Sequence, residues 1–530
     1  MKTIYIGLRS IILPLVIIMM MGCEKNFLDI NTDPNSPTDL PLTQILPAAQ
    51  VGMAFNLSSS VSGFNNASST FVHQIVNARV NEYVIDGTSF TNAWNSVYSG
   101  PLTDFEKIIT KGTELNAPHF VGIAQIQKAY LFSILVDLFG DIPYSEALKG
   151  NDNLTPKFDK DSEIYDNLFV LIDQGITNLN AASSSISPNN TNDLIYAGNR
   201  PLWIKFANTL KLKLYNQIRL VKNVKPEMDA LIASGNLISS ATEDFQIKYG
   251  TSNAPENRNP GFISNYNSAA SRENQVSPFF YFNLKNNNDP RMPYYIYNQV
   301  VAANSAVPNP TDFRDGRFVS VRFASQGPNR NQDQRNFQSL VGLFPVGGRY
   351  DAGTGGTGTL TNGPSDAPLR LLTFYHRKFI EAEAALTIGT TGNPRQLLED
   401  GMRASFAKVN AQAAAVPASI QTVPAIPAAS IDTYVNTILT AYDAAGASGK
   451  LEIIMTQKWI ATFGFGIDAY TDLRRTGFPA IPDPATDADP ETASQRTYPF
   501  RFPYINGELL SNPNAPKQPD IYSVKIFWNN

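Results

Sequence analysis

Cys23 is the only cysteine in this chain of 530 residues, so the fold can contain no intrachain disulfide. It follows the apolar run Ile11–Met21 and a single glycine, and Lys2 and Arg9 precede that run. An apolar run of this length is too short to span a bilayer, which needs about 20 residues. A basic start, a short apolar stretch and a small residue at the cleavage point are typical of an export signal. We therefore expect residues 1–22 to be removed and the fold to be stabilised by packing.

Cleavage at this point would make Cys23 the first residue of the exported chain. Bacterial lipoprotein signals end in this way, and the new first residue carries diacylglycerol on its thiol and a further acyl chain, such as palmitate, on its amine. Met20 stands where leucine is usual. Two or more acyl chains hold a protein durably, since each buried methylene contributes about 0.8 kcal/mol. The alternative is a buried free cysteine. Residues 23–40, rich in turn-forming residues, are predicted to be a lipidated tether.

The mature chain would have 530 − 22 = 508 residues and, without Lys2 and Arg9, a formal charge of −4 − 2 = −6. The sequence has no long run of like charges, so nothing in it predicts binding to nucleic acid. We expect no later stretch to cross a membrane. The chain should therefore be anchored to a membrane without spanning it.

Apolar periodicity predicts a mainly α-helical fold, with one domain over residues 41–530. Between its helices, residues 238–368 are rich in asparagine, proline, glycine and aromatic residues, which predicts a loop-rich, partly β insertion. Residues 411–430 are predicted to be an extended connector. The helices are expected at residues 116–140, 162–179, 201–218, 371–386, 395–409, 431–445 and 451–471.

Trp94, Trp203 and Trp459 lie on apolar helical faces, where a core role is expected. Gly140 should end its helix, because glycine tolerates positive φ. Two consecutive arginines at the end of the last predicted helix, Arg474 and Arg475, can bond its last carbonyls or a nearby carboxylate. These residues are expected to build the scaffold and not to contact a ligand.

Seven short stretches, in this order, resemble the SusD/RagB family of outer-membrane nutrient-binding lipoproteins, and its SusD-like branch in particular. They are Leu135–Ala147, Trp203–Lys211, Asn288–Met292, Phe379–Ala385, Gln457–Trp459, Arg474–Pro479 and Lys525–Trp528. The resemblance covers nearly the whole mature chain. It implies a scaffold of tetratricopeptide-like helical pairs, although we find no 34-residue repeat in the sequence.

The resemblance also implies a function and a partner. Members of the family hold a nutrient at the cell surface and close over a SusC-like TonB-dependent transporter, a β-barrel of the outer membrane. The ligand is an oligosaccharide in the best-known members and a peptide in others. A lipid anchor with a tether suits a hinged lid, since a linker keeps the effective concentration high. Neither the resemblance nor the residues predict a cofactor or a metal.

Sugar sites combine exposed aromatic rings with amide and charged hydrogen-bond partners. Two loop areas fit this description: residues 77–83, with Arg79 and Tyr83, and the insertion. The insertion's candidates are Tyr266, Tyr294 and Tyr295, together with Phe323 and Tyr350. The family's ligand loops vary, so no contact is carried over from it. The alternative for each ring is loop packing.

An exported glycan- or peptide-cleaving enzyme is the main alternative function. His73, His119 and His376 form no His-Glu-x-x-His pattern, and there is no Gly-x-Ser-x-Gly motif. A carboxylate pair for glycoside hydrolysis stays open, although Glu381 and Glu383 should diverge on a helix. A surface adhesin is a third class. The Gly-x-Gly-x-x-Gly sequence at residues 353–358 is predicted to be a loop, because no strand or helix flanks it.

Overall fold

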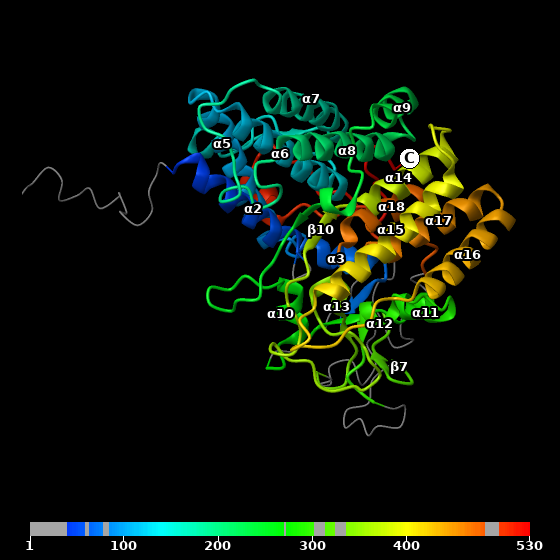
Figure 1. The fold of residues 1–530 in the computed structure, drawn as a ribbon. Helices are drawn as coiled ribbons and strands as arrows, with labels where there is room; N and C mark the ends of the chain where they lie inside the picture. The colour runs from blue at the N-terminus through cyan, green and yellow to red at the C-terminus, as the bar shows by residue number, and fades with distance from the viewer. Residues whose placement is uncertain are drawn as a thin grey trace, which may run out of the picture.

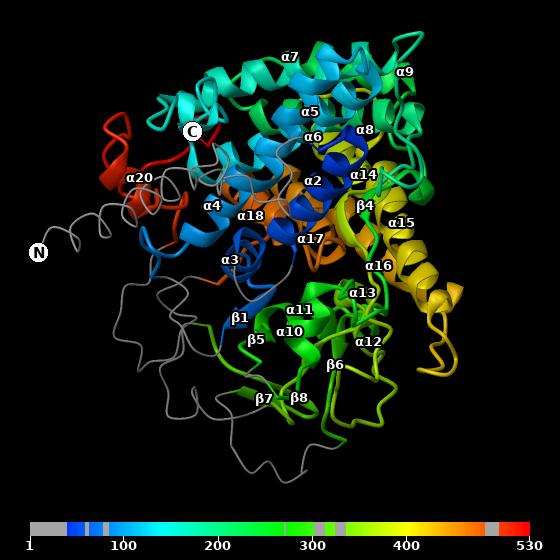
Figure 2. The same cartoon turned by 90° about the vertical axis from the view of Figure 1, so that its left-hand side faces the viewer.

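The computed structural model describes residues 40–58, 63–77, 84–269, 272–301, 313–323, 335–482 and 498–529. The predicted signal and most of the tether lie outside these residues. Helices from both ends of the sequence form one layered body, and the loop-rich segment lies against one end of it (Figure 1, Figure 2). The predicted mainly α fold with helical pairs is confirmed, since neighbouring helices such as α6 and α7, or α14 and α15, pack side by side.

The N-terminal part of the body consists of helices over residues 42–234. They are α2 (Leu42–Leu57), α3 (Phe64–Phe71), α4 (Thr91–Val97), the π-helical turn η1 (Tyr98–Leu102), α5 (Thr103–Glu114), α6 (Pro118–Phe139), α7 (Asp161–Leu179), α8 (Arg200–Ile218) and α9 (Lys225–Ser234). The three helices predicted here, α6, α7 and α8, are confirmed within two residues at each end. Gly140 follows α6 with φ +77°, a conformation that favours glycine.

The C-terminal part supplies the opposite side of the body. Its helices are α14 (Phe374–Thr387), α15 (Pro394–Ala415), α16 (Ala428–Ala444), α17 (Ala447–Ala461), α18 (Gly466–Thr476) and α20 (Asn506–Ser511). The single helix predicted at residues 451–471 was wrong, because Gly464 adopts φ +102° and separates α17 from α18. The apolar pattern runs through this break, since both helices are buried.

The segment between α9 and α14 holds short helices and two-stranded antiparallel pairs. The helices are the 3₁₀ turn η3 (Ala241–Glu243), α10 (Pro260–Tyr266), α11 (Pro278–Asn286), α12 (Met292–Tyr295) and α13 (Leu343–Val346). The strand pairs are β4 (Phe245–Ile247) with β10 (Leu369–Leu372), β5 (Asn274–Val276) with β1 (Ile75–Asn77), β6 (Ile296–Tyr297) with β9 (Leu340–Val341), and β7 (Phe313–Asp315) with β8 (Phe318–Ser320). Outside this segment, β2 (Ile142–Pro143) pairs with β3 (Phe158–Asp159), ahead of which lies the 3₁₀ turn η2 (Gly150–Asp152).

Helix α6 is the central helix of the N-terminal part. The sequence predicted an apolar stripe on one face, but nearly all of its residues are buried. By length and composition it could cross a membrane, contrary to our expectation for this part of the chain. Yet 94% of its apolar window is buried inside the protein, as in the core helix of a soluble domain. The three predicted core residues Trp94, Trp203 and Trp459 are also buried.

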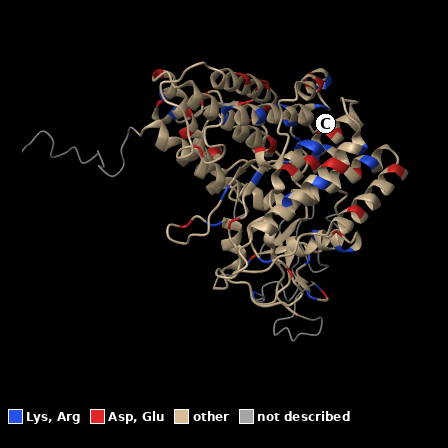
Figure 3. Ribbon diagram, in the orientation of Figure 1, with Lys and Arg blue, Asp and Glu red and all other residues tan. Residues whose placement is uncertain are grey.

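A buried group of charges joins helices from both ends of the chain. The Glu383 carboxylate on α14 lies 2.7 Å from the Arg219 guanidinium, which follows α8, and 2.8 Å from Arg475 on α18. Burial alone would raise the pKa of Glu383, but the two guanidinium groups hold it below its ordinary value. Arg475 also pairs with Asp472 at 2.7 Å, which confirms the expected arginine–carboxylate contact. Residues of both charge signs are interspersed along the helices (Figure 3).

We expect Glu383→Gln to lower the free energy of unfolding by about 3–5 kcal/mol, because it leaves the buried Arg219 guanidinium without its carboxylate and Arg475 with Asp472 alone. Urea unfolding measures this change. The matched control is Asp443→Asn, which breaks the Arg395–Asp443 pair, whose side chains are 41% and 52% exposed. An exposed pair contributes about 0–1 kcal/mol. Equal losses in both variants would mean that the buried Glu383 pairs contribute no more to stability than an exposed ion pair.

A second buried carboxylate, Asp137 on α6, fastens the C-terminal residues to the body. Its Oδ1 accepts hydrogen bonds from the Tyr165 hydroxyl at 2.5 Å and from Trp528 Nε1 at 3.0 Å. Burial raises the pKa of Asp137 to about 6, although the bond from Tyr165 opposes this. The ionised form of the carboxyl is therefore the costly one in the folded protein.

The pKa of Asp137 predicts a pH dependence. Because its folded value lies above the ordinary 3.8, this group's contribution to stability falls as the pH rises from about 4 to about 6 and is constant above. Asp137→Asn keeps an oxygen for Tyr165 and Trp528 but cannot ionise. We expect the unfolding free energy of the variant, measured relative to that of the wild type, to increase between pH 4 and pH 8. A constant difference in thermal unfolding across this range would contradict the assignment.

Candidate functional site

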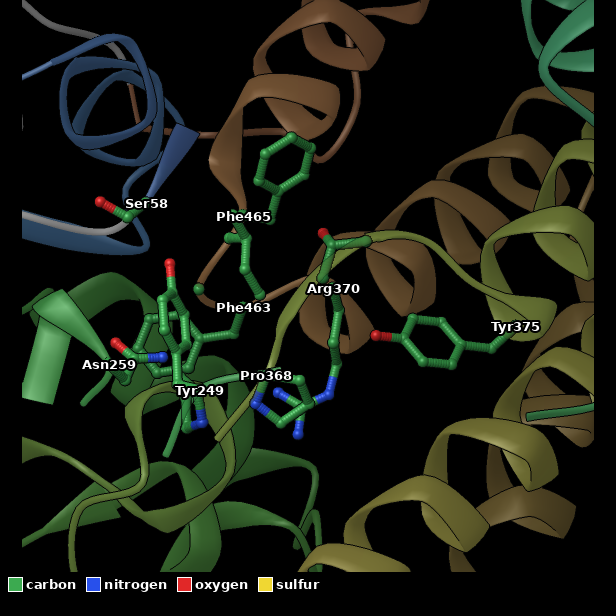
Figure 4. Close-up of a pocket in the computed structure, with 12 residues that line it drawn as sticks. Ser58, Tyr249, Asn259, Pro368, Arg370, Tyr375, Phe463 and Phe465 are labelled. Atoms are coloured by element: carbon green, nitrogen blue, oxygen red, sulfur yellow. The ribbon is translucent and has the colours of Figure 1, made fainter. Parts of the chain in front are cut away.

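A small hollow lies where the helical body meets the loop-rich segment (Figure 4). Tyr249, Asn259, Arg370, Phe463 and Phe465 are among the residues that line it. Its volume is about 10 Å³, which is roughly the space of one water molecule. It cannot accommodate a sugar ring.

Two larger hollows lie on the helices of the N-terminal part. One, of about 680 Å³, lies between α2, α5 and the loop at Leu148 and Gly150. The other, of about 530 Å³, lies on α6 and α7 around Asp173. Neither is lined by an aromatic ring among the residues described. Both therefore lack the flat apolar surface on which a sugar ring packs.

A third large hollow, which is lined by aromatic rings, lies in the loop-rich segment, and we call it the insertion cleft. Its volume is about 650 Å³, within the range of about 300–1,000 Å³ that is usual for small-molecule sites. Its lining comes from α11, α12, β6, the β7–β8 hairpin and the loop after α13. The lining residues are Tyr281, Lys285, Met292, Pro293, Ile296, Asn298, Asp315, Gly316, Arg317, Phe318, Tyr350, Asp351, Ala352 and Gly353.

Local sequence explains how two of these elements form. Helix α11 begins after Ser277, whose side chain accepts a hydrogen bond from the Phe279 N–H, and Pro278 occupies the first turn. Tyr281 and Lys285, four residues apart, then share a face of the helix. In the hairpin, Asp315 pairs with Phe318 across a two-residue turn. Gly316 has φ +59° in this turn, a position that favours glycine.

Polar groups in the insertion cleft bond to one another. Lys285 pairs with Asp315, and Arg317 pairs with Asp351. The hydrogen-bonded Lys285 ammonium lowers the pKa of Asp315, so both members are charged at neutral pH. Tyr281 donates to Asp315 at 3.1 Å, and the Asn298 amide donates to Asp351 at 2.7 Å. The cleft thus presents ordered donors and acceptors beside apolar rings.

Two aromatic rings support the walls of the cleft. Tyr281 stacks on Phe318, with ring centroids 4.0 Å apart and an interplanar angle of 2°. Tyr350 packs against Tyr294, with centroids 4.8 Å apart, and is only half-buried. Of the aromatic residues that the sequence indicated, Tyr350 is the one that lines the cleft.

The other indicated rings of the insertion are buried. Tyr266 donates to the Val341 carbonyl at 3.1 Å and accepts from the Arg349 N–H at 2.7 Å, and Tyr294 donates to the Pro424 carbonyl at 2.6 Å. Tyr295 is fully buried against Phe280 and Phe344, and Phe323 is buried as well. These contacts match the alternative of loop packing. Arg79 and Tyr83 lie outside the described residues, so their role as ligand contacts stays a prediction.

Sequence reasoning missed most of the insertion cleft. Lys285, Asp315, Arg317 and Asp351 are ordinary charged residues in the sequence, and only the fold pairs them. Tyr281 and Lys285 at a helical spacing were a usable signal once α11 was recognised. The Gly-x-Gly-x-x-Gly stretch is a loop, as predicted, and its first glycine, Gly353, lines the cleft.

The groups considered for catalysis have structural partners. His376 caps α14 by accepting a hydrogen bond from the Thr373 N–H, and burial lowers its pKa to about 3. His119 bonds to Ser187 and to the Ala181 carbonyl. Glu381 pairs with Arg377 at 2.6 Å, apart from the Glu383 group. Within the residues described, no three His, Cys, Asp or Glu side chains gather where they could hold a metal ion.

Comparison with known proteins places the fold and the family. Residues 34–504 match a family described as SusD-like, starch-binding and associating with the outer membrane. A chitin-binding protein of known structure is 23% identical, with a TM-score of 0.69 over 92% of this chain and 100% of its own. A SusD homologue from Bacteroides fragilis is 19% identical, with a TM-score of 0.69 over 93% and 100%. A chitin-binding SusD homologue from Flavobacterium johnsoniae is 20% identical, with a TM-score of 0.66 over 92% and 97%. No curated protein sequence matches the chain.

The helical scaffold is that of the SusD homologues of known structure. Because the family match spans most of the chain, the protein belongs to the SusD-like family, as its sequence motifs indicated. A nutrient-binding role and an association with the outer membrane accompany this membership.

Tyr266→Phe tests whether this ring is a packing residue. Removing its hydroxyl leaves the Val341 carbonyl and the Arg349 N–H without their partner, so we expect a loss of about 1–3 kcal/mol in unfolding free energy. The matched control is Tyr281→Phe, whose hydroxyl bonds to the partly exposed Asp315 at the cleft and should cost less than about 1 kcal/mol. Equal small losses in urea unfolding would mean that the Tyr266 hydroxyl reaches solvent.

Proposed function

We propose that this protein captures an oligosaccharide in the insertion cleft at the cell surface and delivers it to a SusC-like TonB-dependent transporter of the outer membrane. The cleft carries the proposal, because it combines a half-exposed ring, Tyr350, with an amide and charged groups already ordered by hydrogen bonds. A member of a starch-binding family needs such a surface to bind sugar.

The choice of a carbohydrate over a peptide draws on the comparisons. The family description names starch, and two of the solved structures are named as chitin-binding. Binding of a peptide in the same cleft is the other outcome of the test below.

The route of delivery draws on the N-terminal residues. An acylated Cys23 followed by the tether of residues 23–40 would keep the domain next to a barrel in the same membrane while it opens and closes. The predicted tether ends at residue 40, and α2 begins at Leu42.

We propose that capture involves no chemistry. His376 is a buried helix cap, and Glu381 and Glu383 are each held by arginines, so these groups serve the scaffold. Cleavage of a bound glycan would contradict this and would direct attention to other carboxylates.

Calorimetry of the soluble chain, begun after Cys23, against panels of oligosaccharides and peptides tests the proposal, with each mixture checked for cleavage products. We expect an oligosaccharide to bind without cleavage. Tyr350→Ala should then weaken binding by about 2- to 10-fold, since a ring contact contributes about 0.5–1.5 kcal/mol. The matched control is Phe55→Ala on α2, a ring that is 64% exposed and does not line the cleft. An equal effect of the two variants would exclude the cleft as the site.

A further inference from the structure

We propose that the insertion cleft selects uncharged oligosaccharides over both acidic and basic ones, because each charge that lines it already has a partner inside it. This inference rests on the proposed function, since it names the ligand class of the same site.

Among the described residues, the charges that line the cleft sum to zero. Lys285 and Arg317 contribute +2, and Asp315 and Asp351 contribute −2. A site that attracts a polyanion normally carries unpaired cations, which raise the local concentration of the ligand. Here the two signs alternate over a short distance and their fields cancel. Neither an acidic nor a basic chain gains from approaching the cleft.

The pairing is specific and reinforced by further bonds. Asp351 accepts from Arg317, from the Asn298 amide at 2.7 Å and from the Gly353 N–H at 2.9 Å. Asp315 accepts from Lys285 and from the Tyr281 hydroxyl at 3.1 Å. A ligand carboxylate that displaced either aspartate would remain next to it, and repulsion between like charges is an effective way to reject a ligand. A ligand ammonium would meet Lys285 and Arg317 in the same way.

Neutral hydroxyl and amide groups of a ligand can bind to the hydrogen-bond donors that the ion pairs do not use. The Lys285 ammonium has three N–H donors, and its contact with Asp315 uses one of them. A sugar oxygen can accept from the other two without displacing an aspartate.

The ring of Tyr350 completes the site for a neutral ligand. Its face can pack on the C–H face of a sugar, and this contact is independent of charge. The volume of about 650 Å³ suits a short stretch of a glycan chain and not a folded partner. Apolar packing and neutral hydrogen bonds therefore provide the affinity.

The test compares oligosaccharides that differ mainly in charge. Chitohexaose is compared with chitosan hexamer, its basic counterpart, and maltohexaose with an oligogalacturonate of the same length. Calorimetry uses the mature chain, residues 23–530, at low salt, where any charge preference is greatest. We expect at least one neutral hexamer to bind at least 10-fold more tightly than its charged counterpart.

Variants that remove one member of an ion pair show whether the pairing of charges causes the preference for neutral ligands. Asp315→Asn leaves Lys285 without its carboxylate, and we expect the affinity for oligogalacturonate to rise at least 5-fold at low salt and to fall again at high salt. Lys285→Gln should favour the chitosan hexamer in the same manner. The matched control, Asp443→Asn, frees Arg395 on the distant α15 and should change neither preference.

The possible outcomes separate this inference from the function on which it rests. Tight binding of a charged hexamer by the wild type, or an unchanged preference in Asp315→Asn and Lys285→Gln, overturns the selection of neutral ligands but leaves glycan capture intact. If no hexamer binds and peptides do, the proposed function fails and the inference fails with it. A neutral preference that the charge variants reverse supports both.

Discussion

The rest of the structure depends on the buried group formed by Glu383, Arg219 and Arg475. It joins α8, α14 and α18, which lie far apart in the sequence, at a point where no water can solvate their charges. A buried charge is tolerable only when it is paired, so the group admits few alternative arrangements of these helices. The pairs Lys458–Asp472 and Lys213–Asp468 extend it through the core at 2.8 and 2.6 Å.

The loop-rich segment has few helices and strands, so its backbone groups need other hydrogen-bond partners. Buried arginines bond to its carbonyls instead: Arg272 donates to the carbonyl of Tyr266, the last residue of α10, and to that of Gly358 in the loop after α13. Arg291 pairs with Asp289 at 2.6 Å and lies 4.7 Å from the centre of the Phe406 ring on α15. These contacts hold the loops against the helical body.

Sequence reasoning predicted the scaffold well and the site poorly. The apolar stripes of α7 and α8 and the glycine after α6 are local signals. They predicted the bounds of these helices to within two residues. The sequence did not predict the break at Gly464, because the residues on both sides of it are buried and continue the apolar pattern. Tyr266 and Tyr295 were natural candidates as loop aromatics, yet they pack inside the segment. Composition cannot separate a ring that lines a cleft from one that fills the core beneath it.

The sequence by itself determined the mainly helical fold, the family and the expectation of an exported, acylated chain. These follow from periodicity, from short motifs and from one cysteine, all of which are read along the chain. Only the tertiary structure decided which charges meet. Lys285 lies 30 residues from Asp315, and Arg317 lies 34 residues from Asp351. Their pairing requires α11, the β7–β8 hairpin and the loop at Asp351 to converge, because ion pairs form through space between side chains that the chain itself does not place together.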